Sequence, residues 1–398
     1  MTATQHPGER DAPGDGTAPE PADWAAWVED QCSLIAATGR WRAPRDFDAA
    51  GHVGRYAPVP GDVPDRDVVS FASNDYLGLS QHPAGRAAAI AAVERWGTGS
   101  GAARLIVGAR PVHRELEHEL AAWRGCEAAV LFPTGFAANL GALTTFAPPG
   151  TRLLSDELNH ASIIDGARLS RADVGVYRHH DLDHLASLLH GTRRAVIVTD
   201  SVFSMDGDVA DLDALAELAA RHGALLVIDE AHAVLGPTLD VSAHDGAAIL
   251  RVGTLSKTLG ALGGFVAGTR RATELLVNRA RSYIFTTAST PADAAAALAN
   301  LRVLRAPEGD ALVARLRANV DRVAPGHPSP IVPIVVGDED DAVEAAAAML
   351  DRGFLVPAIR PPTVPLGSSR LRITLSAAHD DAQIDGLLAA LGDLGLGA

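Results

Sequence analysis

The sequence predicts an α/β protein built on a mostly parallel sheet, and its length of 398 residues predicts two or three domains. Short, continuously apolar runs alternate with Ala/Leu-rich stretches that have helical periodicity. Strands of this kind are buried on both faces, and the helices between them provide the crossovers that parallel strands need. The clearest predicted strands are AAVLF (128–132), RAVIVTD (194–200), ALLVIDE (224–230) and AILRVGT (248–254).

The chain divides into four segments by composition. Residues 1–22 are rich in proline and glycine and predict a disordered tail. Residues 23–67 predict an N-terminal helix, from Trp24 to about Thr38, followed by an arm. Residues 68–294 hold the alternating strands and helices of a large domain. Residues 295–398 predict a smaller C-terminal α/β domain, with a helix, the strand PIVPIVV, a second helix, two short strands and a final helix.

The composition excludes several classes of function. Hydrophobic residues make up 47% and charged residues 21%, as in globular proteins, and the net charge is −15. Such an acidic chain disfavours binding to nucleic acid or to an anionic membrane surface. No apolar run has the ~18 residues of a membrane span, and the first residues lack an export signal, so we expect a cytoplasmic protein. Neither Cys32 nor Cys126 has a cysteine or histidine at metal-ligand spacing, and no metal site is predicted.

Lys257 is the only lysine among 34 basic residues. An arginine-rich coding bias explains the lack of other lysines but leaves open why this one is kept. Lysine can form a Schiff base and, when desolvated, can lose its proton near neutral pH, whereas arginine can do neither. Lys257 follows the predicted strand 248–254 and precedes a glycine-rich passage, so the surrounding residues decide whether its role is chemical.

Asp229 ends the predicted strand before that of Lys257, and His232 follows it. Ligands of open parallel sheets bind beyond the carboxyl ends of the strands, so Asp229 and Lys257 open onto one crevice if the strands are neighbours. A carboxylate at a strand end is by itself often a helix cap. Together, however, a lysine and an acid suit pyridoxal 5′-phosphate (PLP), because the acid keeps the pyridine nitrogen protonated. At ~4 Å and an effective dielectric constant of ~20, such a charge pair interacts by about 4 kcal/mol.

Four further residues suit the same cofactor. Gly135 and Phe136 follow the strand 128–132 at the start of a predicted helix, whose N–H groups could bind a phosphate, although an ordinary strand-to-helix turn looks alike. His160 could stack over an aromatic ring, although a loop histidine is often merely solvated. Ser204 follows the strand 194–200, where its hydroxyl could reach a cofactor oxygen. The glycine-rich passage 97–108 follows a helical stretch rather than a strand, which argues against a dinucleotide-binding motif.

Eight motifs in chain order carry a resemblance to a known family. The chain resembles the α-oxoamine synthases, which are PLP-dependent transferases of fold type I (aspartate-aminotransferase-like), from about residue 24 to the C-terminus. The resemblance implies a homodimer with active sites at the subunit interface. It also implies condensation of an amino acid with an acyl thioester, with release of carbon dioxide. The motifs are SNDYLGLS (73–80), GTGSG (97–101), TGFAAN (134–139), NHASIIDGARLS (159–170), SVFSMDGD (201–208), DEAH (229–232), TLSKTLG (254–260) and RPPTVPLGSSRLRITLSAAH (360–379).

The resemblance also implies roles for single residues. Lys257 would hold PLP covalently and, once released by the substrate, would act as the general base. Asp229 would pair with the pyridine nitrogen, and His232 would hydrogen-bond the ring hydroxyl. His160 would stack on the ring and assist catalysis. The remaining cofactor contacts implied are Gly135, Phe136, Ser204 and Thr254.

The passage 358–379 is most similar to members of the family that join L-alanine to a pimeloyl thioester in biotin synthesis. The sequence leaves open whether coenzyme A or a carrier protein bears the acyl group. Arg372 is the implied clamp for the amino-acid carboxylate, a task that suits a bidentate guanidinium, although a surface arginine on a strand is the alternative. His160, Arg40, Asn74 and Thr363 are the other candidate substrate contacts.

Two other functions remain open from the sequence. The nearer one is a relative that makes 5-aminolevulinate or 2-amino-3-oxobutyrate from glycine. The more distant one is a PLP-fold protein that has lost catalysis and serves as a binding module. The Asp229/Lys257 pair argues against the second, because a non-catalytic descendant need not keep its only lysine.

Overall fold

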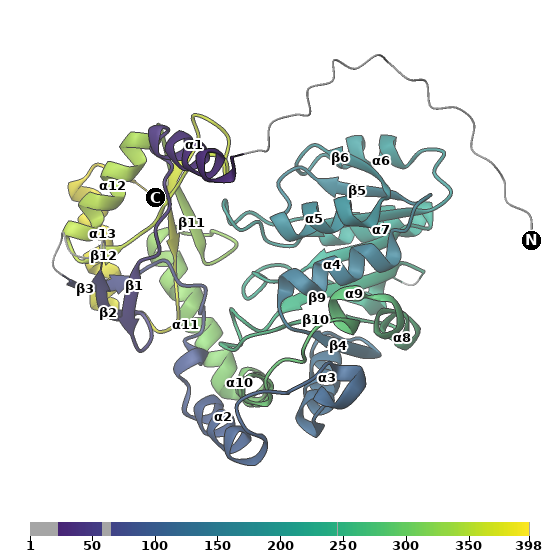
Figure 1. The fold of residues 1–398 in the computed structure, drawn as a ribbon. Coiled ribbons are helices and arrows are strands. Elements are labelled where there is room, and N and C mark those ends of the chain that lie inside the picture. The colour runs from purple at the N-terminus through teal and green to yellow at the C-terminus, as the bar shows by residue number, and fades with distance from the viewer. Residues whose placement is uncertain (1–22, 58–64, 245, 398) are drawn as a thin grey trace, which may run out of the picture.

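The computed structural model describes residues 23–57, 65–244 and 246–397, so the predicted tail lies outside the described residues. A seven-stranded sheet covered by helices forms one part of the molecule, and two smaller sheets with the C-terminal helices form the other (Figure 1). The large sheet is parallel except for β10, which is antiparallel to both of its neighbours. Its strand order is β4 (Ala128–Phe132), β10 (Gly264–Gly268), β9 (Ala248–Thr254), β8 (Leu225–Asp229), β7 (Ala195–Asp200), β5 (Arg152–Asp156) and β6 (Asp173–Tyr177).

Both faces of the large sheet are buried, which explains why its strands read as continuous apolar runs. Successive side chains of a strand point to opposite faces. In β8, Val227 therefore packs into one hydrophobic cluster, whereas Leu226 and Ile228 pack into another. One face is covered by α4 (Gly135–Phe146), α5 (Ala161–Ser170), α8 (Arg270–Arg279) and α9 (Arg281–Ile284). The other is covered by α2 (Pro83–Trp96), α3 (Pro111–Trp123), α6 (Leu182–Leu189), α7 (Leu212–His222) and α10 (Pro291–Leu304).

The second part of the molecule combines N-terminal and C-terminal segments. One sheet has the order β1 (Asp46–Ala49), β2 (Val53–Ala57), β3 (Arg66–Ser70), β12 (Phe354–Leu355). The other has the order β11 (Ile331–Gly337), β14 (Ser369–Thr374), β13 (Ala358–Ile359). The helices of this part are α11 (Pro307–Val323), α12 (Glu339–Asp351) and α13 (Asp381–Asp393).

The core of this second part draws on residues that are far apart in the chain. Phe71 and Leu79 pack in one cluster with Leu316, Leu371 and Leu387. The segment after β3 thus contacts C-terminal elements, and the domain boundaries at residues 68 and 295 stay predictions. Helix α1 (Trp24–Ala37) lies beside the same elements and has no buried residue (Figure 1). Among the described residues, no helix is long and apolar enough to cross a membrane.

Candidate active site

The predicted convergence of Asp229 and Lys257 is present in the structure. Strands β8 and β9 are parallel neighbours, so the segments that follow them open at the same edge of the sheet. Both side chains line a cavity of about 160 Å³. All eight predicted cofactor-binding residues line it: Gly135, Phe136, His160, Ser204, Asp229, His232, Thr254 and Lys257. Four lining residues were not predicted: Asn139, Ser162, Asp200 and Ala231.

A chain of hydrogen bonds starts at the lysine amine. Lys257 Nζ lies 2.6 Å from His232 Nε2, and His232 Nδ1 lies 2.5 Å from the hydroxyl of Tyr76. Tyr76 in turn donates to Asn74 Oδ1 at 3.1 Å. Burial, together with the charges of Lys257 and Arg372, holds the pKa of His232 well below its usual value. A neutral His232 therefore accepts from Lys257 at Nε2 and donates to Tyr76 from Nδ1.

The amine of Lys257 is easier to deprotonate than that of an exposed lysine. Burial lowers its pKa to about 8, with a further contribution from the positive charge of Arg372. The negative charge of Asp229 is the largest effect that opposes this shift, but it does not cancel it. At pH 7, a pKa of about 8 leaves roughly one amine in ten neutral, which is the form that forms a Schiff base.

Asp229 and Asp200 end neighbouring strands, and both are buried. Asp229 Oδ2 accepts from Asn139 Nδ2 at 2.6 Å, and Oδ1 accepts from the Ala231 amide at 2.9 Å. Burial and the nearby charge of Asp229 raise the pKa of Asp200 well above its usual value, so Asp200 loses its proton less readily than an exposed carboxylic acid. Two adjacent buried carboxylates do not both ionise readily, and here it is the pKa of Asp200 that rises.

The start of α4 forms a cradle suited to a phosphate. Thr134 caps the helix by accepting from the Ala137 amide at 3.0 Å. The amides of Gly135 and Phe136 lie in the first turn, where N–H groups have no acceptor within the helix. A Cβ at Gly264 would lie 2.4 Å from the Thr134 carbonyl oxygen and 2.5 Å from the Gly135 nitrogen, so only glycine lets β10 approach this turn.

The residues at this site fit PLP. The cavity combines an amine that deprotonates near neutral pH, a buried acid and a helix N-terminus suited to a phosphate. Asn139 Oδ1, on a residue that lines this cavity, is buried and has no hydrogen-bond partner among the described residues. His160 caps α5, and its ring lines the cavity with Nδ1 2.8 Å from Ser162 Oγ. Its stacking on the cofactor stays a prediction.

Arg372 and Asn74, two predicted substrate contacts, lie together beside the cofactor cavity. Arg372 on β14 is buried and donates from Nε to the Ser204 carbonyl oxygen at 2.6 Å. It also donates from Nη2 to Asn74 Oδ1 at 3.2 Å and from Nη1 to Thr374 Oγ1 at 2.8 Å. A positive charge is therefore held next to Ser204, which itself lines the cavity.

Arg40 and Thr363 lie elsewhere. Arg40 pairs with Glu339 at 2.6 Å and lines a cavity of about 520 Å³ with apolar residues of α1 and with Trp41. Thr363 is exposed and lines a third cavity, of about 760 Å³. Neither residue lines the cofactor cavity. Their contacts with substrate stay predictions.

Among the residues missed by the sequence analysis, three show which signals the sequence does and does not contain. Asp200 ends a predicted strand, so the rule that singled out Asp229 could have found it. Asn139 lies four residues after Gly135, on the same face of α4, a spacing that could have been used. Tyr76 reaches His232 from a distant part of the chain, and nothing local in the sequence indicates that contact.

Comparison with known proteins gives a consistent result. The sequence matches the aminotransferase class I and II family over residues 66–391. The 8-amino-7-oxononanoate synthase of Anaeromyxobacter dehalogenans is 52% identical over 385 residues, which cover 92% of this chain and 94% of the relative. The chain belongs to the 8-amino-7-oxononanoate synthase family. The predicted α-oxoamine synthase resemblance and the predicted acyltransferase class are thereby confirmed.

Solved structures support the same assignment to the 8-amino-7-oxononanoate synthase family. The Francisella tularensis 8-amino-7-oxononanoate synthase has a TM-score of 0.68 and 28% identity, covering 82% of this chain and 98% of that one. A serine palmitoyltransferase from S. paucimobilis with a bound PLP–myriocin aldimine has a TM-score of 0.84 and 27% identity, covering 94% of this chain and all of that one. The predictions of fold type I and of PLP as the cofactor are confirmed.

Proposed function

We propose that the protein catalyses the PLP-dependent decarboxylative condensation of L-alanine with a pimeloyl thioester. The products are 8-amino-7-oxononanoate, carbon dioxide and the free thiol carrier, in biotin biosynthesis. The observation that carries the proposal is the only lysine of the chain, which lines one small cavity with a buried carboxylate and a free helix N-terminus. When bound, PLP provides an electron sink for negative charge that develops at the amino-acid Cα.

Lys257 and Asp229 are the central catalytic residues in this proposal. Lys257 would hold the cofactor covalently and, once released, would take the Cα proton, a role that suits an amine with a pKa of about 8. His232 Nε2, at 2.6 Å, orients the amine. Asp229 would pair with the pyridine nitrogen, and Asn139 and the Ala231 amide hold its two oxygens in place.

Arg372 is the proposed clamp for the alanine carboxylate. A guanidinium has five N–H donors in one rigid plane, so it can keep its bonds to the Ser204 carbonyl and Thr374 while the substrate carboxylate replaces Asn74 at Nη2. Its buried position next to the cavity strengthens the attraction to a carboxylate, since water does not screen the pair. Asn74 would then receive the hydrogen bond of Tyr76 alone.

We propose a homodimer with this cavity near the interface. Leu105, Ile106 and Val107 form an apolar turn with exposed fractions of 50, 73 and 70%, and α9 packs against that turn. Phe285, at the end of α9, is 70% exposed. Exposed apolar patches of this kind are typical of subunit interfaces. Ile106→Asp should shift the protein toward the monomer in light scattering, and an unchanged dimer would contradict this placement. A cytoplasmic location stays a prediction from the sequence.

A product assay by mass spectrometry tests the function. Purified protein is incubated with L-alanine and either pimeloyl-CoA or a pimeloyl-carrier protein, and in parallel with glycine and succinyl- or acetyl-CoA. We expect 8-amino-7-oxononanoate from alanine, and none from the Lys257→Ala variant. Turnover of glycine alone would refute the substrate assignment. A Lys257-dependent PLP absorbance band that does not respond to any amino acid would favour a non-catalytic binding protein.

A further inference from the structure

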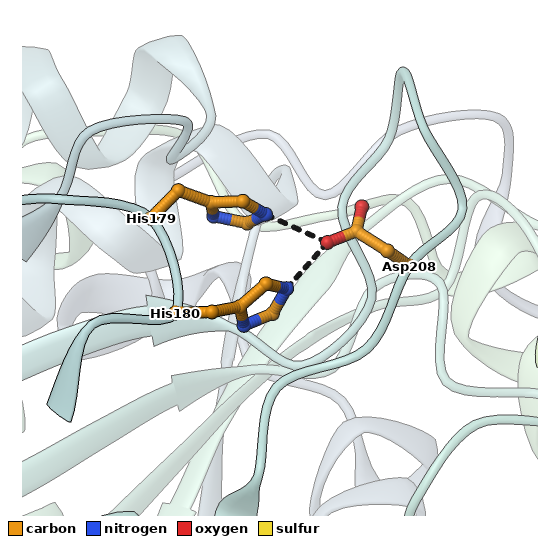
Figure 2. Close-up of side chains that lie close together, drawn as sticks. All are labelled: His179, His180 and Asp208. Atoms are coloured by element: carbon orange, nitrogen blue, oxygen red, sulfur yellow. Dashed lines mark hydrogen bonds and ion pairs between the residues drawn. The ribbon is translucent and has the colours of Figure 1, made fainter.

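His179, His180 and Asp208 converge outside the cofactor cavity. The two histidines follow β6, and Asp208 lies in the loop after β7. Both histidine rings face the Asp208 carboxylate (Figure 2). His179 Nε2 lies 2.7 Å and His180 Nε2 lies 2.5 Å from the same oxygen, Asp208 Oδ2. The three potential ligand atoms lie within 4.8 Å of one another. Two loops therefore point one carboxylate and two ring nitrogens of the same type at a single point.

The surroundings orient both rings. The second nitrogen of His179, Nδ1, lies 2.9 Å from the buried carboxylate of Asp156. Metal-binding histidines usually donate their other N–H to a carboxylate or carbonyl in this way, which fixes the ring and makes the ligand nitrogen more basic. Phe203 packs edge-on against both rings, with centroid distances of 4.4 Å to His179 and 5.4 Å to His180.

One oxygen of the cluster is left unused. Asp208 Oδ1 is buried and has no hydrogen-bond partner within the described residues. The three side chains line the cavity of about 760 Å³, which also contains the carboxylate of Glu157. The cluster thus contains one carboxylate oxygen that accepts no hydrogen bond, and the adjoining cavity has room for a water molecule or another ligand beside the three side chains.

We propose that His179, His180 and Asp208 bind a divalent transition-metal ion, with Asp156 orienting His179. Two imidazoles and one carboxylate suit Zn²⁺, and the fourth position opens to the cavity. Tetrahedral zinc with ligands at ~2.0–2.1 Å holds them roughly 3.3 Å apart. The present nitrogen-to-oxygen distances of 2.5 and 2.7 Å therefore need to widen by only roughly 0.6–0.8 Å.

The position of this cluster suggests what the metal does. Asp208 shares its loop with Ser204, which lines the cofactor cavity and holds Arg372 through its carbonyl oxygen. A metal bound to both loops would tie the Ser204 loop to the end of β6. Its role would be to position the cofactor cavity rather than to take part in the chemistry there. The competing arrangement is a metal-free one, in which His179 bridges Asp156 and Asp208 by hydrogen bonds alone.

Zinc binding by the PLP-loaded protein tests the proposal. Protein treated with chelator is dialysed against Zn²⁺ and then against buffer, and its metal content is measured by mass spectrometry. We expect one tightly held zinc per wild-type chain, and one fewer in His180→Asn. The control is His190→Asn, because His190 is exposed and lies outside the cluster. Asp156→Asn should weaken zinc binding roughly 10- to 100-fold while leaving the three ligands in place.

A second measurement separates loss of the site from loss of the fold. Zinc should raise the melting temperature of wild-type protein and of His190→Asn, since a ligand that binds the native state stabilises it. It should not raise that of His180→Asn. Equal zinc content and equal thermal shifts in wild type and His180→Asn would overturn the proposal. So would the absence of retained zinc in the wild type.

Discussion

Replacing Asp229 by asparagine (Asp229→Asn) removes the negative charge proposed to face the pyridine nitrogen while keeping the size of the side chain. Asp229 is only 6% exposed, so bulk water does not compensate for the loss. At ~4 Å and an effective dielectric constant of ~20, the lost attraction is about 4 kcal/mol. Since about 1.4 kcal/mol corresponds to a factor of ten in rate, we expect kcat to fall roughly 10³-fold.

The matched control is Asp200→Asn at the end of the neighbouring strand. Asp200 is equally buried, but burial and the charge of Asp229 raise its pKa, so it favours the uncharged form more than an exposed aspartate does. Its kcat should stay within about tenfold of wild type, within the usual range for a lost neutral hydrogen bond. Turnover is measured at saturating PLP and both substrates, with absorbance confirming that the cofactor is bound. Similar losses in the two variants, or an active Asp229→Asn, would refute this account of the charge.

Three further outcomes are expected. The rate at which the apoprotein binds PLP, followed by stopped-flow absorbance, should rise about tenfold per pH unit below pH 8 and then level off. The reason is that the neutral amine of Lys257 reacts, and its pKa is lowered to about 8. A rate that does not change with pH would contradict this. Gly264→Ala should lower the free energy of unfolding by about 1–3 kcal/mol and weaken PLP binding, since its Cβ would lie 2.4 Å from a carbonyl oxygen. The control Gly99→Ala, which has open space around it, should change neither PLP binding nor the melting temperature. Glu230→Gln should destabilise the protein in urea unfolding by roughly 3–5 kcal/mol, because it leaves the buried guanidinium of Arg251, now 2.5 Å from Glu230, without its counter-charge; unchanged stability would refute the importance of that pair.

Much of the large sheet was predictable because its strands are buried on both faces. The segment 128–132 forms a strand with the predicted bounds, and those at 194–200 and 224–230 form strands shorter by one or two residues. The same burial made Asp229 conspicuous, since a charged residue at the end of an apolar strand needs a reason. Neither strand β10 nor its reversed direction was predicted, and an apolar run does not reveal its orientation.

The site was predictable where residues follow strands and unpredictable where they meet across the fold. Gly135, Ser204 and Lys257 each follow a strand, and the structure brings them to one cavity. Tyr76 lies 156 positions before His232 in the chain, and no local pattern in the sequence indicates that the two side chains meet. The pair of His179 and Asp208 was missed for the same reason, since 29 residues separate them.

All Lys and Arg positions of this chain except Lys257 are arginine. The single side-chain amine therefore belongs to Lys257, which lies in the cofactor cavity next to His232. An acylating dye selective for amines can therefore react at only two places, the chain's own terminal amine and the catalytic pocket. Dye incorporation at Lys257 then measures the fraction of chains whose pocket holds no cofactor. Bound PLP would protect the Lys257 amine from the dye. Cofactor loading can therefore be measured as loss of labelling at this one residue, without any engineered tag.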